Sequence, residues 1–227
     1  MIFLLQDLAN PDSTASTGKQ TITFLDTIID GGWAMIPLEV LLVLAIFIYI
    51  ERYRNIRRAD TDSEEFMKQV RRFVMAGDIE AAKSLCASLN DPFSRMIYKG
   101  ISRLGNASLK DIEGSIENVG KLEVYRLERR VSLLATIAGA APMIGFFGTV
   151  LGMISAFNEI QRTGGNASAA DLAGGISEAM VTTASGLVVG IVAYIGYNTL
   201  VAMINKVVFK LELTSTDFID LLQEPAK

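Results

Sequence analysis

The chain has 227 residues, of which 50% are hydrophobic and 20% are charged, and its mean hydropathy is +0.35. This composition is too apolar for an ordinary soluble domain and favours a membrane protein, while a net charge of −4 gives no reason to expect nucleic acid as a partner. A single cysteine, Cys86, and the absence of histidine exclude intrachain disulfides and any catalytic or metal site built on histidine.

The amino-terminal segment, residues 1–30, begins with the short apolar run MIFLLQDL and continues with a stretch rich in Ser, Thr, Pro, Asn and Asp. The apolar run is shorter than the hydrophobic region of a signal peptide, and no basic flank precedes it. The polar stretch has the composition of a solvated linker. We therefore expect an interfacial or unstructured end before the first span.

The first predicted transmembrane helix covers residues 31–51, and its apolar core runs from Trp33 to Ile50. This length just crosses the hydrocarbon core of a bilayer, and Trp33 is typical of an interfacial anchor. Glu39 lies near the outer end of this span, where a carboxylate can reach toward water. A structural role is therefore favoured over a functional one for Glu39.

Residues 52–130 predict a soluble domain of short helices. An acidic start follows Asp60, and Gly77 ends the first helix. Asp78 is placed to cap a second helix, which the Asn90-Asp91-Pro92 breaker ends, and a third helix runs to about Leu104. Ser108 and Asp111 resemble a capping box. Because no breaker follows Ser108, one continuous helix is expected to carry this domain into the second span.

Two more transmembrane helices are predicted, at residues 131–160 and 172–205, joined by a loop at residues 161–171 and followed by a carboxy-terminal helix at residues 206–227. The second span has no ionisable side chain as far as Asn158, and the third has only Glu178. At 1.5 Å per residue each stretch is about 40 to 50 Å long, which exceeds the hydrocarbon thickness. Their inner ends should extend into water or be covered by protein.

Basic residues set the expected orientation. They cluster after the first span and before the second, at Arg52, Arg54, Arg57, Arg58, Arg126, Arg129 and Arg130. Such flanks belong in the cytoplasm. The amino-terminal segment and the loop at 161–171 are then on the outer side of the membrane, and residues 52–130 and 206–227 are cytoplasmic. The predicted fold is an all-α membrane protein with three transmembrane helices, two of them long and extending into a helical cytoplasmic domain.

Small residues are dense in the second and third spans. They include Gly145, Gly148, Gly152, Gly186 and Gly190. This spacing lets helices approach closely, so packing of a helical hairpin is the favoured interpretation. Glycines alone specify no activity.

Hydroxyl groups carry more information about function. Thr149 lies inside the second span, and Thr182, Thr183 and Ser185 lie inside the third. In an antiparallel hairpin centred near Gly165, two residues at the same depth, one from each helix, have numbers that sum to about 331. This relation places Thr149 level with Thr182 or Thr183. Such hydroxyls can line a hydrated path. Alternatively, each can bond to the carbonyl one turn back.

Glu178 lies one to two turns inside the outer end of the third span, and an ionisable group at such a depth is a functional candidate by default. Its structural alternative is a carboxylate stabilised by the helix N-terminus and paired with Arg162. The second and third spans have no other acid at mid-depth, so a partner must supply one. Such helices repeated around an axis would enclose a polar lumen, which predicts a homo-oligomer around a partner helix.

Two motifs carry a resemblance: APMIGFFGTVLGMISAF from Ala141 and GISEAMVTTASGL from Gly175. They resemble the MotA/TolQ/ExbB proton channel family, most closely its ExbB branch. The resemblance extends more weakly from Gly31, through IERY at Ile50 and GDIEAA at Gly77. Three spans disfavour a four-span, MotA-like stator.

The resemblance implies a pentamer in the bacterial inner membrane, around a dimer of a single-span ExbD-like or TolR-like partner whose transmembrane Asp carries protons. It assigns the pore threonines to Thr149 and Thr183 and the transmembrane glutamate to Glu178. It also assigns helix geometry to Pro142 and Gly148. Thr182 adds a hydroxyl beside the expected pair and joins the candidate ion pathway.

The function expected from this resemblance is the pore-forming subunit of a motor driven by proton-motive force. With its ExbD-like partner and a TonB-like protein, it would energise outer-membrane transport. One alternative is a TolQ-like envelope-integrity motor, or a related gliding or stator motor; another is a non-conducting membrane scaffold. An enzyme is disfavoured and no cofactor is expected, because the sequence has no nucleophile with a base, phosphate loop or metal cluster.

Overall fold

The computed structural model describes residues 32–60, 63–166 and 168–224, so the expectation for residues 1–30 lies outside the described residues. Over the described ranges all regular elements are helices, which confirms the all-α prediction. In chain order they are α2 (Met35–Ala59), α3 (Ser63–Met75), α4 (Ile79–Ser88), α5 (Pro92–Ile101), α6 (Leu109–Glu128), α7 (Val131–Arg162) and α8 (Ala169–Gln223).

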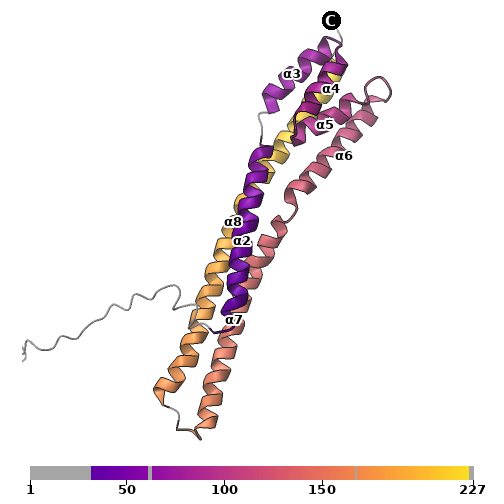
Figure 1. The fold of residues 1–227 in the computed structure, drawn as a ribbon. Coiled ribbons are helices and arrows are strands. Elements are labelled where there is room, and N and C mark those ends of the chain that lie inside the picture. Colours follow the sequence, from indigo (N-terminus) through magenta and orange to yellow (C-terminus); the bar gives the residue numbers. More distant parts are fainter. Residues whose placement is uncertain (1–31, 61–62, 167, 225–227) are drawn as a thin grey trace, which may run out of the picture.

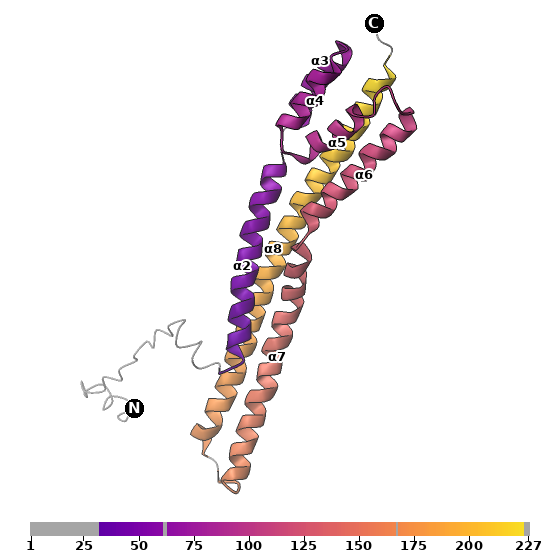
Figure 2. The same ribbon diagram turned by 45° about the vertical axis from the view of Figure 1, so that its right-hand side comes forward.

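The molecule is a long rod with a helical cluster at one end. The helices α2, α7 and α8 lie side by side along the rod, and the loop between α7 and α8 closes its far end (Figure 1). The helical cluster consists of α3, α4, α5 and α6 around the carboxy-terminal part of α8 (Figure 2). The helix α8 continues without a break past residue 205, where the predicted third span ends, so it belongs to both the rod and the cluster.

The rod is held together by a repeat of buried residues every three or four positions, which is the pattern of a coiled-coil seam. On α8 the buried apolar positions are Ala179, Val189, Ala193, Leu200, Ile204, Val207, Leu211, Phe218 and Leu221. On α2 they include Met35, Leu38, Ala45, Ile48 and Ile56. A sequence with this spacing buries one stripe of each helix and leaves the rest exposed.

The exposed faces of the rod are also apolar, as expected of a membrane protein. Large exposed side chains include Val43, Phe47, Met143, Phe146, Phe157, Val188, Ile191 and Ile195. Soluble monomers rarely expose such continuous apolar surface. Within the described residues, two stretches are long and apolar enough to cross a bilayer, Leu109–Arg162 and Leu172–Gln223. The helix α2 is not one of them, since it begins at Met35, contains Glu39 and reaches Glu51 and Arg52 within 18 residues, so the count of three spans stays a prediction.

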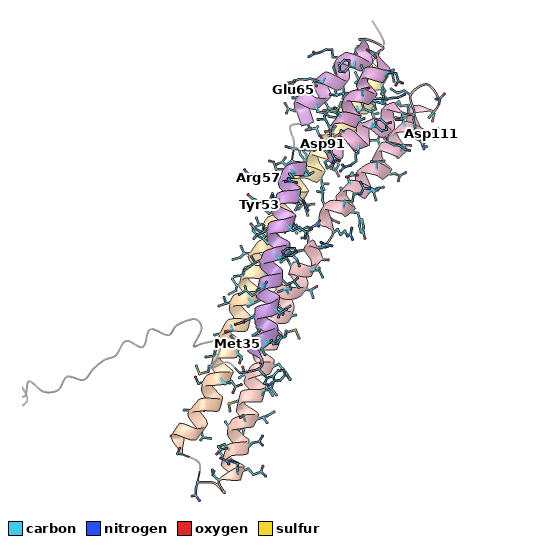
Figure 3. All side chains as sticks on the ribbon, in the orientation of Figure 1. Met35, Tyr53, Arg57, Glu65, Asp91 and Asp111 are labelled. Carbon is cyan, nitrogen blue, oxygen red and sulfur yellow. The ribbon has the colours of Figure 1, made fainter. Side chains whose placement is uncertain are left out.

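The predicted helix starts of the cluster are present, although α5 ends at Ile101, three residues before the predicted Leu104. Gly77 has a φ of +75° and follows α3, and the Asp78 carboxylate accepts a hydrogen bond of 3.0 Å from the Ala81 N–H. Asp91 caps α5 in the same way, and Ser108 with Asp111 forms a capping box on α6. Figure 3 shows Asp91 and Asp111 within the cluster, far from Met35 near the other end of α2.

The prediction of one continuous helix from Ser108 into the second span is wrong. The helix α6 ends at Glu128, and Arg130 takes left-handed backbone angles, with a φ of 69°. Its Nη1 donates to both carboxylate oxygens of Glu51 on α2, at 3.1 and 3.2 Å. This bond joins residues far apart in the sequence, so no local pattern indicates the break. The break turns α6 away from the line of α7 (Figure 2).

Candidate functional site

The hairpin of α7 and α8 has the register predicted from the sequence. A Cβ added to Gly145 would lie 3.2 Å from Thr183 Cα, and one added to Gly152 would lie 2.8 Å from Ala179 Cβ. These contacts join residues whose numbers sum to about 331. The depth relation between the two long helices is therefore confirmed.

Glycines allow the two backbones to touch. A Cβ on Gly186 would lie 2.7 Å from the Ala141 carbonyl oxygen, which is closer than real Cβ contacts allow. A Cβ added to Gly190 would lie 2.7 Å from Cγ of the Pro142 ring. Gly148 and Gly152 face α8 in similar contacts. These residues pack the helices, and none offers a group that binds an ion.

Thr149 and Thr183 meet across this contact, and their hydroxyls are hydrogen-bonded to each other. The Thr183 hydroxyl also donates to the Gly145 carbonyl at 3.0 Å. The Thr149 hydroxyl lies 3.3 Å from the Ala179 carbonyl of α8 and 3.4 Å from the Gly145 carbonyl one turn back on its own helix. Two hydroxyls have only two protons to donate, so lone pairs on both oxygens are left to accept from a further donor. Both side chains are half-buried, so that donor can be water or a protonated acid on another chain.

Thr182 does not join this pair. It is fully buried, and its hydroxyl donates to the Glu178 and Ala179 carbonyls of its own helix at 2.9 and 3.0 Å. Its side chain packs against Gly148. This geometry matches the alternative in which a membrane threonine bonds to the carbonyl one turn back.

Glu178 lies half-buried against the start of α2. A Cβ added to Gly32 would overlap the Glu178 carboxylate in its present position, so a larger residue at 32 would displace this side chain. Glu178 forms no ion pair within the described ranges, and Arg162 instead pairs with Glu159 at 2.8 Å. Glu178 precedes Thr183 by five positions, and this spacing corresponds to a rise of about 7.5 Å along a helix. The carboxylate is thus about one and a half turns from the threonine pair, toward the α7–α8 loop.

Glu39 is more buried than the sequence analysis expects. Its Oε1 is enclosed and has no hydrogen-bond partner among the residues that the structure describes. The helices α2 and α8 run parallel, with Gly32 beside Glu178 and Tyr49 beside Gly196. Glu39 therefore lies near the depth of residue 185, within about one turn of the threonine pair. Sequence reasoning places this acid at the outer end of the span, without the cover that the hairpin provides.

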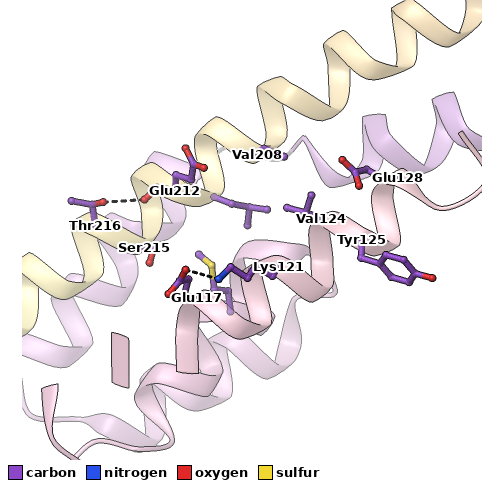
Figure 4. A pocket seen from close by; sticks show the side chains of 12 residues that line it. Glu117, Lys121, Val124, Tyr125, Glu128, Val208, Glu212, Ser215 and Thr216 are labelled. Atoms are coloured by element: carbon purple, nitrogen blue, oxygen red, sulfur yellow. Dashed lines mark hydrogen bonds and ion pairs between the residues drawn. The ribbon is translucent and has the colours of Figure 1, made fainter. Parts of the chain in front are cut away.

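A groove between α6 and α8 is the feature that sequence reasoning missed. It encloses about 530 Å³, and its apolar floor includes Met96, Val208 and Leu211. Glu117, Glu128 and Glu212 lie along it with one base, Lys121, which pairs with Glu117 at 2.7 Å (Figure 4). The groove is acidic and lies in the helical cluster, so it is suited to a basic surface. From the sequence alone, acids at helical spacing predict only an ordinary solvent-exposed face, so they do not indicate a groove.

Known proteins resemble this chain over the same helices. The family model described as the MotA/TolQ/ExbB proton channel family matches residues 88–213, which contain Thr149, Glu178 and Thr183. The putative biopolymer transport protein ExbB-like 1 of Synechocystis sp. is 30% identical over 186 residues, covering 81% of this chain and 73% of the relative. The Tol-Pal system protein TolQ of Haemophilus influenzae is 41% identical over 85 residues, which is 37% of either chain. The biopolymer transport protein ExbB of Salmonella typhimurium is 38% identical over 137 residues, which is 54% of this chain and 52% of that one.

Proposed function

We propose, since this chain belongs to the MotA/TolQ/ExbB proton channel family, that it is the pore-forming subunit of an inner-membrane motor driven by proton-motive force. The observation that carries the proposal is the hydroxyl pair of Thr149 on α7 and Thr183 on α8. Glu178 lies about one and a half turns from Thr183 on α8. No other polar side chains of α7 and α8 meet across the hairpin at this depth among the described residues.

The proposed topology has three spans, formed by α2 and the apolar parts of α7 and α8. The amino terminus and the α7–α8 loop are then periplasmic, and the helical cluster and the carboxy terminus are cytoplasmic. The arginines that follow Ile50 and those that precede Val131 support this orientation. Lipid would contact the exposed apolar faces described above.

The proposed assembly is a homo-oligomer, a pentamer as in the family, around a dimer of an ExbD-like or TolR-like single-span partner. Large apolar side chains on α7 and α8 stay exposed after α2 has packed against them, so these faces have room for helices of neighbouring copies as well as for lipid. The acidic α6–α8 groove and the exposed Arg57 on α2 belong to different elements of one chain. A closed ring of copies can bring such unlike surfaces together.

In the proposed mechanism, a partner Asp takes up a proton beside Thr149 and Thr183. Burial in a low-dielectric lumen disfavours the charged carboxylate, and the hydroxyl oxygens can accept the hydrogen bond of the neutral acid. When the acid releases its proton, the same hydroxyls can turn and donate to the carboxylate. Each charge that crosses 100 mV provides about 2.3 kcal/mol, so several protons can drive a large movement of the partner.

The proposed client is a TonB-like protein that energises outer-membrane transport, as expected of the ExbB branch. The alternative is a TolQ-like role in the cell envelope, since the chain also resembles a TolQ protein, with 41% identity over 85 residues. Co-purification from cells that express a tagged TonB-like candidate or tagged Tol-Pal system candidates distinguishes these clients. Stable capture of one and not the other assigns the role.

The experiment that tests the motor replaces Thr149 and Thr183 by valine, which keeps the shape of each side chain and removes the hydroxyl. We expect proton uptake by proteoliposomes containing the chain and its partner to fall by roughly tenfold or more, with the oligomer intact. Thr136→Val and Thr199→Val are matched controls, because those threonines donate to carbonyls of their own helices. Unchanged uptake in the double variant, or an equal loss in the controls, would favour a scaffold.

A further inference from the structure

A second site lies where α2 leaves the rod and meets the helical cluster. A cavity of about 240 Å³ opens between the last turns of α2, the start of α5 and the last turns of α6. Its polar and charged lining residues are Arg52, Asn55, Arg58, Asn90, Arg95, Glu123 and Arg126. Four arginines thus line the cavity with a single carboxylate.

Arg52 is the unusual member of this group, because it is only 9% exposed. Its Nη2 donates to Glu51 at 2.8 Å, but its Nε is buried and has no acceptor within the described residues. Buried N–H groups in native proteins nearly always have an acceptor, and a guanidinium presents its donors as a fixed fork. The geometry therefore calls for an acceptor from outside this chain.

Glu123 does not satisfy this need. It is 2% exposed, and its oxygens accept from Arg95 Nε at 3.0 Å, from Arg95 Nη2 at 2.6 Å and from Arg126 Nη1 at 2.5 Å. Its charge is already shared between two guanidinium groups. The four arginines of the lining outnumber the two carboxylates that contact them in the described interactions, Glu123 and Glu51.

The position of the cavity indicates the chemistry of its ligand. Ile50 is the last large exposed apolar residue of α2, and Arg52 follows it by two positions. A side chain at the end of an apolar span lies at the level of lipid headgroups, and basic pockets on the cytoplasmic side bind anionic headgroups. Phosphate oxygens match the guanidinium fork in two-bond contacts. The cavity also holds far more than one water, whose share of liquid volume is about 30 Å³.

We propose that this cavity binds a phosphate group, held by Arg52 and the neighbouring arginines, and that its depth selects the phosphodiester of an anionic phospholipid. Such a ligand would join α2, α5 and α6 at the membrane surface. The site goes beyond the proposed motor function. Its test measures ligand binding, so failure of either proposal is distinguishable from failure of the other.

The test uses the full complex in nanodiscs that contain phosphatidylglycerol in a phosphatidylcholine background. Native mass spectrometry after gentle transfer to detergent measures retained phosphatidylglycerol. We expect Arg52→Gln to reduce retention by about tenfold or more, because it removes a charge-assisted contact. Arg54→Gln is the matched control, since Arg54 is exposed on the same helix and does not line the cavity. Arg58→Gln, at an exposed lining position, serves as a second variant if Arg52→Gln does not fold.

A second arm separates lipid from soluble phosphate. Inorganic phosphate is added to the complex in nanodiscs of phosphatidylcholine alone, and thermal unfolding is compared with and without it. Retention of phosphatidylglycerol that depends on Arg52 supports the lipid source, and stabilisation by inorganic phosphate alone supports a soluble phosphate at the same site. Binding that is absent in both arms, or that Arg54→Gln reduces as much as Arg52→Gln does, overturns the proposal.

Discussion

The Glu178 carboxylate of α8 occupies the space that a side chain on Gly32, just before α2, would fill. Gly32 also has a φ of +62°, a conformation that side-chain-bearing residues rarely adopt. One glycine thus serves two purposes: it starts α2 and leaves room for the acid near the periplasmic end of the proposed pathway. The placement of Glu178 therefore depends on α2 as well as on its own helix.

Replacing Gly32 by alanine should displace the Glu178 carboxylate as well as strain the backbone. Gly77 is the control, because it has a similar φ of +75° and no atoms within 4 Å of an added Cβ. Both variants lose about 1 kcal/mol or more to the left-handed backbone. Because the carboxylate is the far end of a flexible side chain and can move aside at little cost, we expect Gly32→Ala and Gly77→Ala to lose similar stability, measured by thermal unfolding in nanodiscs. A much larger loss for Gly32→Ala would show that the Glu178 carboxylate is held in place and cannot move aside.

The close contact of α7 with α8 can be tested with two glycine-to-alanine variants whose effects on stability should have opposite signs. Gly186→Ala would press a Cβ onto the Ala141 carbonyl and should destabilise the protein by about 1 to 3 kcal/mol. Gly174→Ala, on the same helix, meets no atom within 4 Å among the described residues. Because alanine is the better helix former by about 1 kcal/mol, this variant should be neutral or stabilising. Thermal unfolding of both variants in one membrane mimic checks the opposite signs.

Asp60 joins the end of α2 to α8 through bonds from the Lys206 and Lys210 ammonium groups. Burial acts to raise the pKa of Asp60, but the two lysines outweigh it and lower the pKa below its ordinary value of 3.8. A lowered folded-state pKa stabilises the fold above the unfolded value, and this contribution is lost as the pH falls through the folded value. Its stability contribution is therefore complete near neutral pH and disappears below pH 3.8.

Asp60→Asn should therefore cost about 1 kcal/mol at pH 7, and the difference from the unaltered chain should shrink as the pH falls below 3.8. Thermal unfolding across this range measures both quantities. Glu80→Gln is the control, because the Glu80 side chain is largely exposed and its bond to Lys83 stays within one helix. A difference from Asp60→Asn that is constant with pH would show that the carboxylate is not stabilised by the lysines.

The features that the sequence predicts well are those with a local cause. Asp78 and Ser108 cap helices through bonds to residues three positions away, and both caps are present. The register of α7 with α8 also follows from the sequence, because one short loop fixes the sum of paired residue numbers. Thr149 and Thr183 are brought together by that register, with no further information about the rest of the fold.

The features that the sequence analysis misses depend on contacts between distant elements. The Arg52 cavity needs α2, α5 and α6 together, and the cover over Glu39 Oε1 needs the hairpin beside α2. Thr182 and Thr183 are neighbours with the same side chain, and only their directions on α8 separate a packing hydroxyl from a paired one. A pattern of residue types does not show, for each single residue, in which direction its side chain points from the helix.

The break at Arg130 can be tested by comparing glycine with alanine at this position. Both variants lose the exposed ion pair with Glu51, so their difference reports the backbone alone. In a continuous helix, alanine would be more stable than glycine by about 1 kcal/mol. At the observed φ of 69°, glycine avoids the cost of a left-handed residue, about 1 to 2 kcal/mol, so we expect Arg130→Gly to unfold at the higher temperature. If Arg130→Ala were the more stable variant in nanodiscs, α6 and α7 would form one helix in the membrane.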